Sequence, residues 1–404
     1  MSEIFKKEVY NAFKKVSPSK IQIEDHEEYR RYREGHYNLF FHKLKFPPEL
    51  FKGKKIIDFG CGTGEVDMVL AGWGGLVEGF DFNEVSIARA NDLKEQLGFS
   101  RQNEFSVGDI DTYSYKQAEG YDISMSFGVI AHVPDQENMF RRMAKVAKAG
   151  GYVMLGFVED AGLIQRLLHR AIVLANSEKS DEEIFRIAKT CFSEHIDRSV
   201  SIGLRSAESV INDYLVNPHY IGLSTQKLLL WASRYNLEYY SGWPSIELPF
   251  AVDSPYFKLI PKDSHVYSLY FSLLRLRWLY AQDEDRFVFE DMTGHLPDVH
   301  RDIESLFDGL NDILQKRDVS DVTFSDVQAN LKNVEHEVAT LVKEVSGYIN
   351  HNLEELNSEL IRILEMIVHK IRDNKDFDLA KVNGKLFKGY NGLGSSYMVF
   401  HRPE

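Results

Sequence analysis

Hydrophobic and polar positions follow two alternating patterns in the first part of the chain. Short apolar runs, typical of buried strands, are separated by stretches in which apolar residues recur every three or four positions, typical of amphipathic helices. Strands are predicted over 54–59, 76–80, 105–108, 121–127 and 152–158. Helices are predicted within 1–45 and over 65–71, 83–97 and 136–149, the last closed by Gly150-Gly151. This alternation predicts an α/β fold with a parallel sheet covered by helices on both faces.

Beyond residue 159 the alternation is interrupted twice. A helical pattern over 224–235 and strand-like runs over 237–240 and 395–401 look like later parts of the same sheet. We therefore interpret the segments between them as insertions into one fold. The predicted parts are an N-terminal helical lid (1–45), the core (46–159), a substrate-lid insertion (160–222), a return to the core (223–246), a helical insertion (247–392) and a last core strand (393–404).

The second insertion contains a heptad-like apolar seam over 321–372. Steps of three and four run from Phe324 to Val345, and they resume from Ile349 to Ile367 after a stutter near Gly347. Such a seam is typical of a coiled coil or a helical hairpin, because a helix that is apolar on one face must bury it. A straight helix needs a second chain, whereas a bend at the stutter lets the two halves cover each other. Both a homodimer and a folded-back hairpin therefore fit the pattern.

Charge and cysteine content narrow the classes of function. The formal net charge is −13, which argues against a nucleic-acid substrate because phosphate binding normally requires a basic surface. The only cysteines, Cys61 and Cys191, make no disulfide framework, and no clustered histidine and cysteine set predicts a metal site. We expect a cytoplasmic protein, since neither a signal peptide nor an apolar run of the ~20 residues that span a membrane is visible.

The strongest chemical signal is the run Asp58-Phe59-Gly60-Cys61-Gly62-Thr63-Gly64 between the first predicted strand and helix. Its glycines allow a tight turn and close approach of a ligand, and the helix behind them offers free N–H groups. A dinucleotide fingerprint would place a glycine where this chain has Glu65, and a pyrophosphate would be repelled there. S-adenosylmethionine (SAM) has no phosphate and carries an amino acid and a sulfonium, so this acidic loop suits it better.

Two further carboxylates follow predicted strands. Asp81 ends the second strand, where an acid can accept both ribose hydroxyl protons, although a lone aspartate there is also a common helix cap. Asp109 follows the third strand and could accept from the adenine amine or simply form a turn. Phe82 and Ile110, which follow these two carboxylates in the sequence, could cover the adenine ring. The predicted cofactor-binding set is Asp58, Gly60, Cys61, Gly62, Gly64, Asp81, Phe82, Asp109, Ile110, Ser126 and Phe127.

The run from Lys54 to Glu159 resembles a class I SAM-dependent methyltransferase of the small-molecule type. The matching pieces, in order, are Ile-Ile-Asp-Phe-Gly-Cys-Gly-Thr-Gly, Gly-Phe-Asp-Phe-Asn, Val-Gly-Asp-Ile, Phe-Gly-Val-Ile-Ala-His-Val-Pro-Asp and Ala-Lys-Ala-Gly-Gly-Tyr-Val-Met-Leu. The resemblance implies a Rossmann-like sheet of seven strands with the last antiparallel, and SAM as cofactor. Ala149 departs from the family, which usually has proline there. The two insertions are additions to the minimal family, so its substrates are not carried over.

The sequence signals for catalytic and acceptor-binding residues are weaker than those for the cofactor site. His132 is a candidate catalytic base, with a structural or cofactor-shaping role as the alternative. Tyr37, His195, Asn217 and His219 are candidate acceptor-binding residues, because hydrogen-bonding groups and aromatics are dense around them; ordinary loop or capping roles are the alternative.

These features together predict a methyltransferase that acts on a polar small-molecule or glycan-like acceptor, by O- or N-methylation. An RNA or protein methyltransferase is one alternative, which the acidic balance disfavours. A non-catalytic SAM-binding scaffold that presents the coil is the other, and the intact cofactor motifs disfavour it.

Overall fold

The computed structural model describes residues 2–15, 26–177, 180–203, 205–217, 219–246, 296–316, 325–330, 332–334, 336, 352–382 and 395–404. These residues form two compact units. Unit 1 contains 1–158, 199–247 and 395–404, and unit 2 contains 159–198 and 248–394. The predicted insertion 160–222 is thus divided between the two units.

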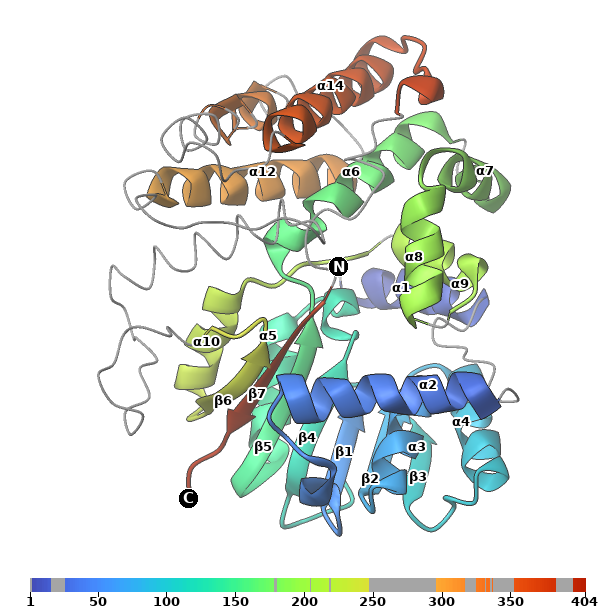
Figure 1. Cartoon of the computed structure of the whole chain (residues 1–404), viewed down its shortest axis with the longest axis vertical. Coiled ribbons are helices and arrows are strands. Elements are labelled where there is room, and N and C mark those ends of the chain that lie inside the picture. The colour runs from blue at the N-terminus through green and yellow to red at the C-terminus, as the bar shows by residue number, and fades with distance from the viewer. Residues whose placement is uncertain are drawn as a thin grey trace. The chain divides into compact units, whose positions relative to one another are not determined.

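Unit 1 is built on a seven-stranded sheet in the order β3-β2-β1-β4-β5-β7-β6 (Figure 1). The first five strands are parallel, and β7 runs antiparallel to both of its neighbours. This confirms the Rossmann-like seven-stranded fold and the late strand near the C-terminus. The strands are β1 (Lys55–Phe59), β2 (Leu76–Asp81), β3 (Asn103–Val107), β4 (Tyr121–Phe127), β5 (Ala147–Phe157), β6 (Glu238–Trp243) and β7 (Ser396–His401).

Helices cover the sheet of unit 1. Helix α3 contacts β2 and β3, α4 contacts the same two strands, and α5 contacts β4 and β5. Helix α2 crosses in front of the strands in Figure 1. The unit's helical elements are α1 (Ser2–Lys15), α2 (His26–Tyr37), η1 (Asn38–Lys43), η2 (Pro48–Phe51), α3 (Glu65–Gly72), α4 (Glu84–Gln96), η3 (Ile130–His132), α5 (Gln136–Val146), α9 (Ala207–Ile211), η4 (Asn212–Val216) and α10 (Thr225–Arg234).

The core explains why the apolar runs become strands. Four of the five β1 residues are buried, as expected for a central parallel strand covered on both faces. Strand ends are followed by polar caps: the Asn83 side chain accepts from Val85 N at the start of α4, and Asp135 accepts from Asn138 N at the start of α5. One core cluster comprises Phe40, Leu44, Phe46, Phe51, Ile56, Leu70, Val77, Ile123, Met125, Met154 and Val399.

One predicted boundary is wrong. The helix expected over 136–149 ends at Val146, and Gly150-Gly151 lies within β5 instead of closing the helix. The reason is pairing with the C-terminal strand region: Gly150 N donates to the Arg402 carbonyl, and Arg402 N donates to Gly151 O. Gly150 has a φ of 72°, so it makes an irregular start to the strand.

Unit 2 is helical. Helix α6 (Asp160–Asn176) contacts α12 (Leu296–Lys316) and α14 (Asn352–Asp373), and α7 (Asp181–Cys191) contacts the short turn η6 (Leu379–Lys381). Helix α8 (Ser193–Gly203) crosses the boundary between the units. The described members of the predicted seam that are buried are Val327, Val334, Leu360, Ile363 and Ile367.

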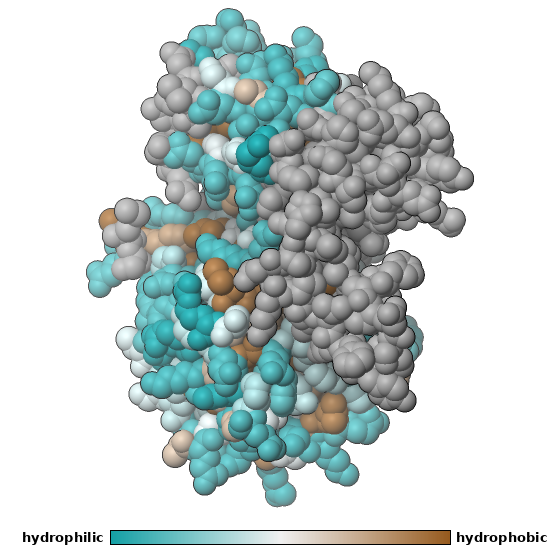
Figure 2. All heavy atoms as spheres, turned by 90° about the vertical axis from the view of Figure 1, so that its left-hand side faces the viewer, coloured by the Kyte–Doolittle hydropathy of each residue, from teal (hydrophilic) through white to brown (hydrophobic). Residues whose placement is uncertain are grey.

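Two further seam positions, Leu353 and Leu356, lie in α14, and the remaining ones, like Gly347 at the stutter, lie outside the described residues. Within unit 2, α14 packs on α6. The homodimer and the hairpin both stay predictions. Figure 2 shows one face of the molecule, on which hydrophilic side chains predominate among the described residues. No described helix is long and apolar enough to cross a membrane.

Candidate functional site

The glycine loop joins the end of β1 to the start of α3. Gly60, Gly62 and Gly64 all have φ between 56° and 78°, a region that favours glycine. Gly60 N and Cys61 N donate to the Phe80 carbonyl of β2, which fixes the loop to the neighbouring strand. A Cβ on Gly60 would lie 2.6 Å from a methyl of Val129, so this position also needs glycine for space. The loop is therefore a tight cradle of backbone groups at the carboxyl edge of the sheet.

Asp81 stands opposite this loop at the end of β2. Its Oδ2 accepts from Gly62 N at 3.0 Å, and its Oδ1 accepts from Asn83 N at 2.8 Å. Burial raises the pKa of Asp81, while these two backbone hydrogen bonds act against the shift. The carboxylate keeps further lone pairs for a ligand, because each oxygen can accept more than one hydrogen bond. The predicted neighbour Phe82 has its ring 5.7 Å from that of Tyr10 on α1.

A second acidic group lies beneath the loop. Asp58 is buried in β1, and Asp67 of α3 is fully buried. Burial raises the pKa of Asp58 to about 7, although a hydrogen bond with Asp67 counteracts the shift. Burial and the charge of Asp58 raise the pKa of Asp67 well above its usual range. Burial also raises the pKa of Cys61, which keeps this thiol protonated at neutral pH.

The third predicted carboxylate, Asp109, already has a partner in the chain. Lys6 of α1 places Nζ 2.9 Å from Asp109 Oδ2 and 2.5 Å from Asp111 Oδ2. Ile110 between them is half-buried. A ligand amine at Asp109 would therefore lie beside the N-terminal helix.

The two residues that end β4 differ in accessibility. Ser126 is fully buried, and its Oγ donates to the Phe59 carbonyl at 2.7 Å, so it ties β4 to β1. Phe127 is half-buried and packs its ring near those of Phe40 and Tyr397. Of this predicted pair, Phe127 is the one with side-chain surface left for a ligand.

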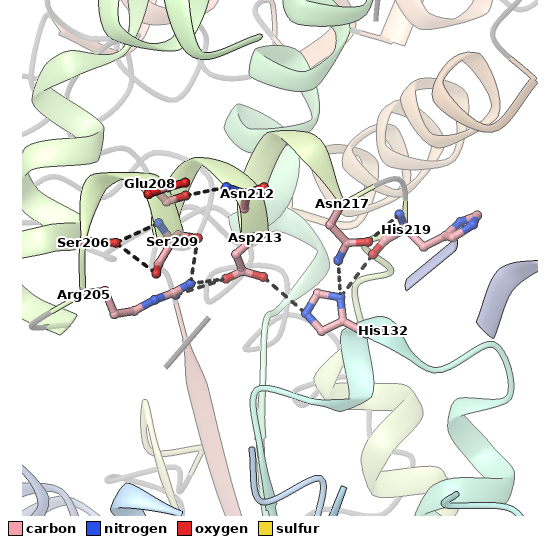
Figure 3. Close-up of polar contacts among 9 residues, drawn as sticks. All are labelled: His132, Arg205, Ser206, Glu208, Ser209, Asn212, Asp213, Asn217 and His219. Carbon is pink, nitrogen blue, oxygen red and sulfur yellow. Dashed lines mark hydrogen bonds and ion pairs between the residues drawn. The ribbon is translucent and has the colours of Figure 1, made fainter. Parts of the chain in front are cut away.

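His132 follows β4 in the short turn η3 and has polar neighbours at both ring nitrogens (Figure 3). Nδ1 lies 2.9 Å from Asn217 Nδ2 and 3.1 Å from the His219 carbonyl. Nε2 lies 3.6 Å from Asp213 Oδ1, which is longer than a hydrogen bond. Asp213 in turn accepts from both terminal nitrogens of Arg205, at 3.1 Å each.

Helix α1 contacts both parts of the site. Besides Lys6 at Asp109, the Phe13 carbonyl accepts from Asn83 Nδ2 at 3.2 Å, on the cofactor side. On the other side the Phe13 ring meets the edge of His132, with centroids 5.0 Å apart. Glu8 pairs with His219 Nε2 at 2.6 Å. The predicted N-terminal lid thus has described contacts to both groups of residues.

The structure brings two of the four candidate acceptor-binding residues together. Asn217 and His219 contact His132. Tyr37 is 41% exposed at the end of α2, and its ring partners are Phe41 and His42. His195 belongs to unit 2, where burial and then the charges of Arg166 and Arg198 lower its pKa to about 3.

Sequence reasoning missed Asp213 as a neighbour of His132, and Arg205 as the partner of Asp213. Asp213 stands in the polar run Asn212-Asp213-Tyr214, but nothing in the pattern of that run shows that its backbone forms the π-helix η4. Arg205 precedes α9 and carries no motif. Among the residues that the structure describes, no group of three or more His, Cys, Asp or Glu side chains could hold a metal ion.

Comparison with known proteins assigns the region that contains these motifs. Residues 50–210 match a family model described as "Methyltransferase domain". Ubiquinone biosynthesis O-methyltransferase of Coxiella burnetii is 33% identical over 102 residues, which is 25% of this chain and 42% of that protein. The protein of the same name from Escherichia coli is 30% identical over 112 residues, covering 27% of this chain and 45% of that one. The chain thus spans less than half the length of these relatives.

Among solved structures, magnesium protoporphyrin IX methyltransferase from Synechocystis with bound SAH is 17% identical. The match covers 48% of this chain and 67% of that one, with a TM-score of 0.30. The assignment of this domain rests on the sequence comparisons.

Proposed function

We propose that this chain, whose residues 50–210 are a methyltransferase domain, transfers the methyl group of SAM to a hydroxyl group of a polar small molecule. The observation that carries the proposal is the contact between the segments that follow the first two strands. The glycine loop after β1 and the carboxylate after β2 are connected by the hydrogen bond from Gly62 N to Asp81 Oδ2. For a nucleoside cofactor such as SAM, the glycine loop would allow close approach of the ligand, and Asp81 would accept hydrogen bonds from the ribose hydroxyls.

The residues present fit SAM. The loop approaches Val129 so closely that a side chain at Gly60 would have no room. Gly128 at the end of β4 has only open space where a Cβ would be, so the edge is accessible beside the cradle. SAM supplies an activated methyl group bound to a sulfonium. The chain's own contribution is to hold that group in line with the attacking atom and to accept a proton where the attacking atom carries one.

Two observations support a hydroxyl group as the methyl acceptor. The curated relatives named above are O-methyltransferases of ubiquinone biosynthesis by name. In addition, His132 lies beside the carboxylate of Asp213, and this pairing suits the removal of a hydroxyl proton. A glycan-like acceptor remains within this class, because a sugar also presents hydroxyl groups.

The test is calorimetry of SAM binding to the full chain. We expect low micromolar or somewhat weaker affinity, and Asp81→Ala should cost about 1–3 kcal/mol, the scale for losing charged hydrogen bonds. Asp81→Asn is the matched control, because it keeps the size of the side chain and one acceptor oxygen and should lose less. Unchanged SAM affinity in Asp81→Ala would contradict the assignment of the site.

We further propose that part of the segment 160–222 covers the acceptor. Its support is that Asp213, Asn217 and His219 all contact His132 from this segment. Hydrogen exchange should slow over 205–217 when SAM and an accepted substrate are added together. No added protection there would contradict the lid.

The helices of the second insertion are proposed to contribute nothing to methyl transfer itself and to act in packing or dimerisation. Replacing residues 300–372 by a short linker should leave SAM binding and turnover unchanged. Mass in solution then separates a dimer from a hairpin within one chain. Loss of turnover in a folded, SAM-binding truncation would contradict this role.

A further inference from the structure

Asp213 reaches His132 from an unusual backbone. The segment Asn212–Val216 is a π-helix, a rare form that is frequent at functional sites. It lies against α1 and leaves both Asn212 and Asp213 buried. A buried carboxylate requires compensation, and the forked contact with Arg205 supplies it. This arrangement holds one oxygen of Asp213 toward Arg205 and the other toward His132 (Figure 3).

The opposite edge of the ring is set by Asn217, which is fully buried. The Asn217 Oδ1 atom accepts from His219 N at 3.1 Å, so the amide orientation is fixed and its N–H donors point at His132 Nδ1. A donor at Nδ1 favours the ring without a proton on that nitrogen. The His219 carbonyl, 3.1 Å from the same nitrogen, favours the ring with a proton there.

The remaining surroundings of the ring are aromatic. Phe13 of α1 and Tyr220 both meet it at steep angles, with centroids 5.0 and 4.9 Å away. The charged groups described near it include Asp213 with Arg205 behind it, and the pair of His219 and Glu8 on the Asn217 side. With water largely replaced by rings, these few charges act strongly on the ring.

We propose that Asp213 and Asn217 are positioning residues that set the proton affinity of His132 in opposite directions, Asp213 raising it and Asn217 lowering it. This inference rests on the proposed methyl transfer to a hydroxyl. Arg205 belongs to the same arrangement, because it orients Asp213 and offsets part of its charge.

The proton balance of the transfer explains why two opposing groups are useful. When the acceptor oxygen takes the methyl group, an O–C bond forms, the C–S bond breaks and its electron pair stays on sulfur. The hydroxyl proton goes to His132 Nε2, on the edge that faces Asp213, while Nδ1–H is donated to the His219 carbonyl. Asp213 stabilises the imidazolium so formed. After the products leave, Nε2 releases this proton to water, which restores the neutral ring with its proton on Nδ1. Asn217, whose N–H groups face Nδ1, makes the protonated ring less stable and so favours this release.

The test is an NMR titration of the full chain labelled with ¹³C-histidine, which needs no knowledge of the acceptor. The chain has 14 histidines, and His132→Gln identifies the resonance. Asp213→Asn should lower the pKa of His132 by about 1 unit, since an opposite charge at this distance is removed. Asn217→Leu should raise that pKa, because the donor that favours the neutral ring is lost. Arg205→Gln, which leaves both His132 and Asp213 in place, should also raise it by removing a positive charge.

Glu208→Gln is the matched control, because this carboxylate is exposed on α9 and only its backbone carbonyl contacts the segment. It should leave the His132 titration unchanged. Shifts of the same sign in Asp213→Asn and Asn217→Leu, or an effect of Glu208→Gln as large as that of Asp213→Asn, would overturn the proposal. SAM calorimetry on the same samples separates the two hypotheses: absence of SAM binding to the unmodified chain overturns the proposed function, whereas normal binding with an unmoved His132 overturns only this inference.

Discussion

Two parts of unit 1 are built in different ways. The cofactor edge consists of the glycine loop 60–64 and Asp81, and the acceptor edge consists of His132 with Asp213 and Asn217. Gly62 and Asp81, which meet at the cofactor edge, are 19 positions apart in the sequence. His132 and Asn217, which meet at the acceptor edge, are 85 positions apart. The first edge depends mainly on backbone groups and left-handed glycines within one strand–helix–strand unit. The second depends on side chains from η3, η4 and the loop after it, so it can change its chemistry while the sheet stays the same.

Each edge should therefore respond to its own class of mutation. Changes at the cofactor edge should alter folding and SAM affinity together. Changes at the acceptor edge should alter turnover alone. The four predictions below test that separation, from the largest expected effect to the smallest.

Gly60→Ala should damage the cofactor edge most. The residue has a φ of 78°, and its Cβ would lie 2.6 Å from Val129, so backbone strain adds to a steric clash. We expect a loss of about 3 kcal/mol in the free energy of unfolding, together with much weaker SAM binding. Gly128→Ala is the control, because Gly128 has a similar φ of 75° but nothing within 4 Å of the new Cβ. Equal losses of stability in the two variants would show that the clash with Val129 plays no part.

His132→Gln should damage only the acceptor edge. Removing a proton-accepting ring typically lowers turnover by about 100-fold, while the glycine loop and Asp81 are untouched. The measurement is transfer from labelled SAM into a metabolite pool that contains an accepted substrate, alongside calorimetry of SAM. The separation of the two edges fails if SAM affinity falls in step with turnover.

Asp67→Asn should change how the stability of the protein depends on pH, because it removes one member of the acidic pair Asp58 and Asp67 beneath the glycine loop. The pKa of Asp58 is raised to about 7 and that of Asp67 is raised well above its usual range, so the native state holds more protons than the unfolded chain above about pH 4. Stability of the unmodified chain should therefore fall as pH rises from about 4 to 7. In Asp67→Asn this fall should shrink, because one of the two groups that hold a proton in the native state is removed. Thermal unfolding across that range is the measurement, and an identical pH profile in the two proteins would exclude the pair as its source.

The same contrast explains how much could be read from the sequence. The order of strands and helices, the glycine loop and Asp81 lie within continuous motifs whose local pattern determines their structure. Ser126 was a reasonable choice by position, yet its hydroxyl is used to join β4 to β1. The end of α5 was misplaced because Gly150 and Gly151 pair with Arg402, more than 250 residues away, and no local pattern records that contact.

Only some residues of the acceptor edge could be predicted from the sequence, for the same reason. His132 and Asn217 could be selected as residue types that suit polar chemistry. Their mutual contact, and the roles of Arg205 and Asp213, follow from a π-helix and from packing across distant segments. His195 is also a residue type that suits polar chemistry, and its sequence context does not show that burial lowers its pKa.

The smallest effect is expected from Lys6→Ala, at the point where α1 contacts the cofactor edge. Lys6 bridges Asp109 and Asp111, but all three side chains are more than a third exposed, and such ion pairs contribute about 0–1 kcal/mol. The loss should increase hydrogen exchange in α1 and should be reduced by added salt, whereas SAM affinity should change less than about threefold. Lys7→Ala is the matched control, because Lys7 is exposed on the same helix and makes none of these contacts. If Lys6→Ala instead weakened SAM binding as much as Asp81→Ala, α1 would have to be counted as part of the cofactor site. The two edges would then share one element whose docking governs both, and mutations in α1 should reduce SAM affinity and turnover together.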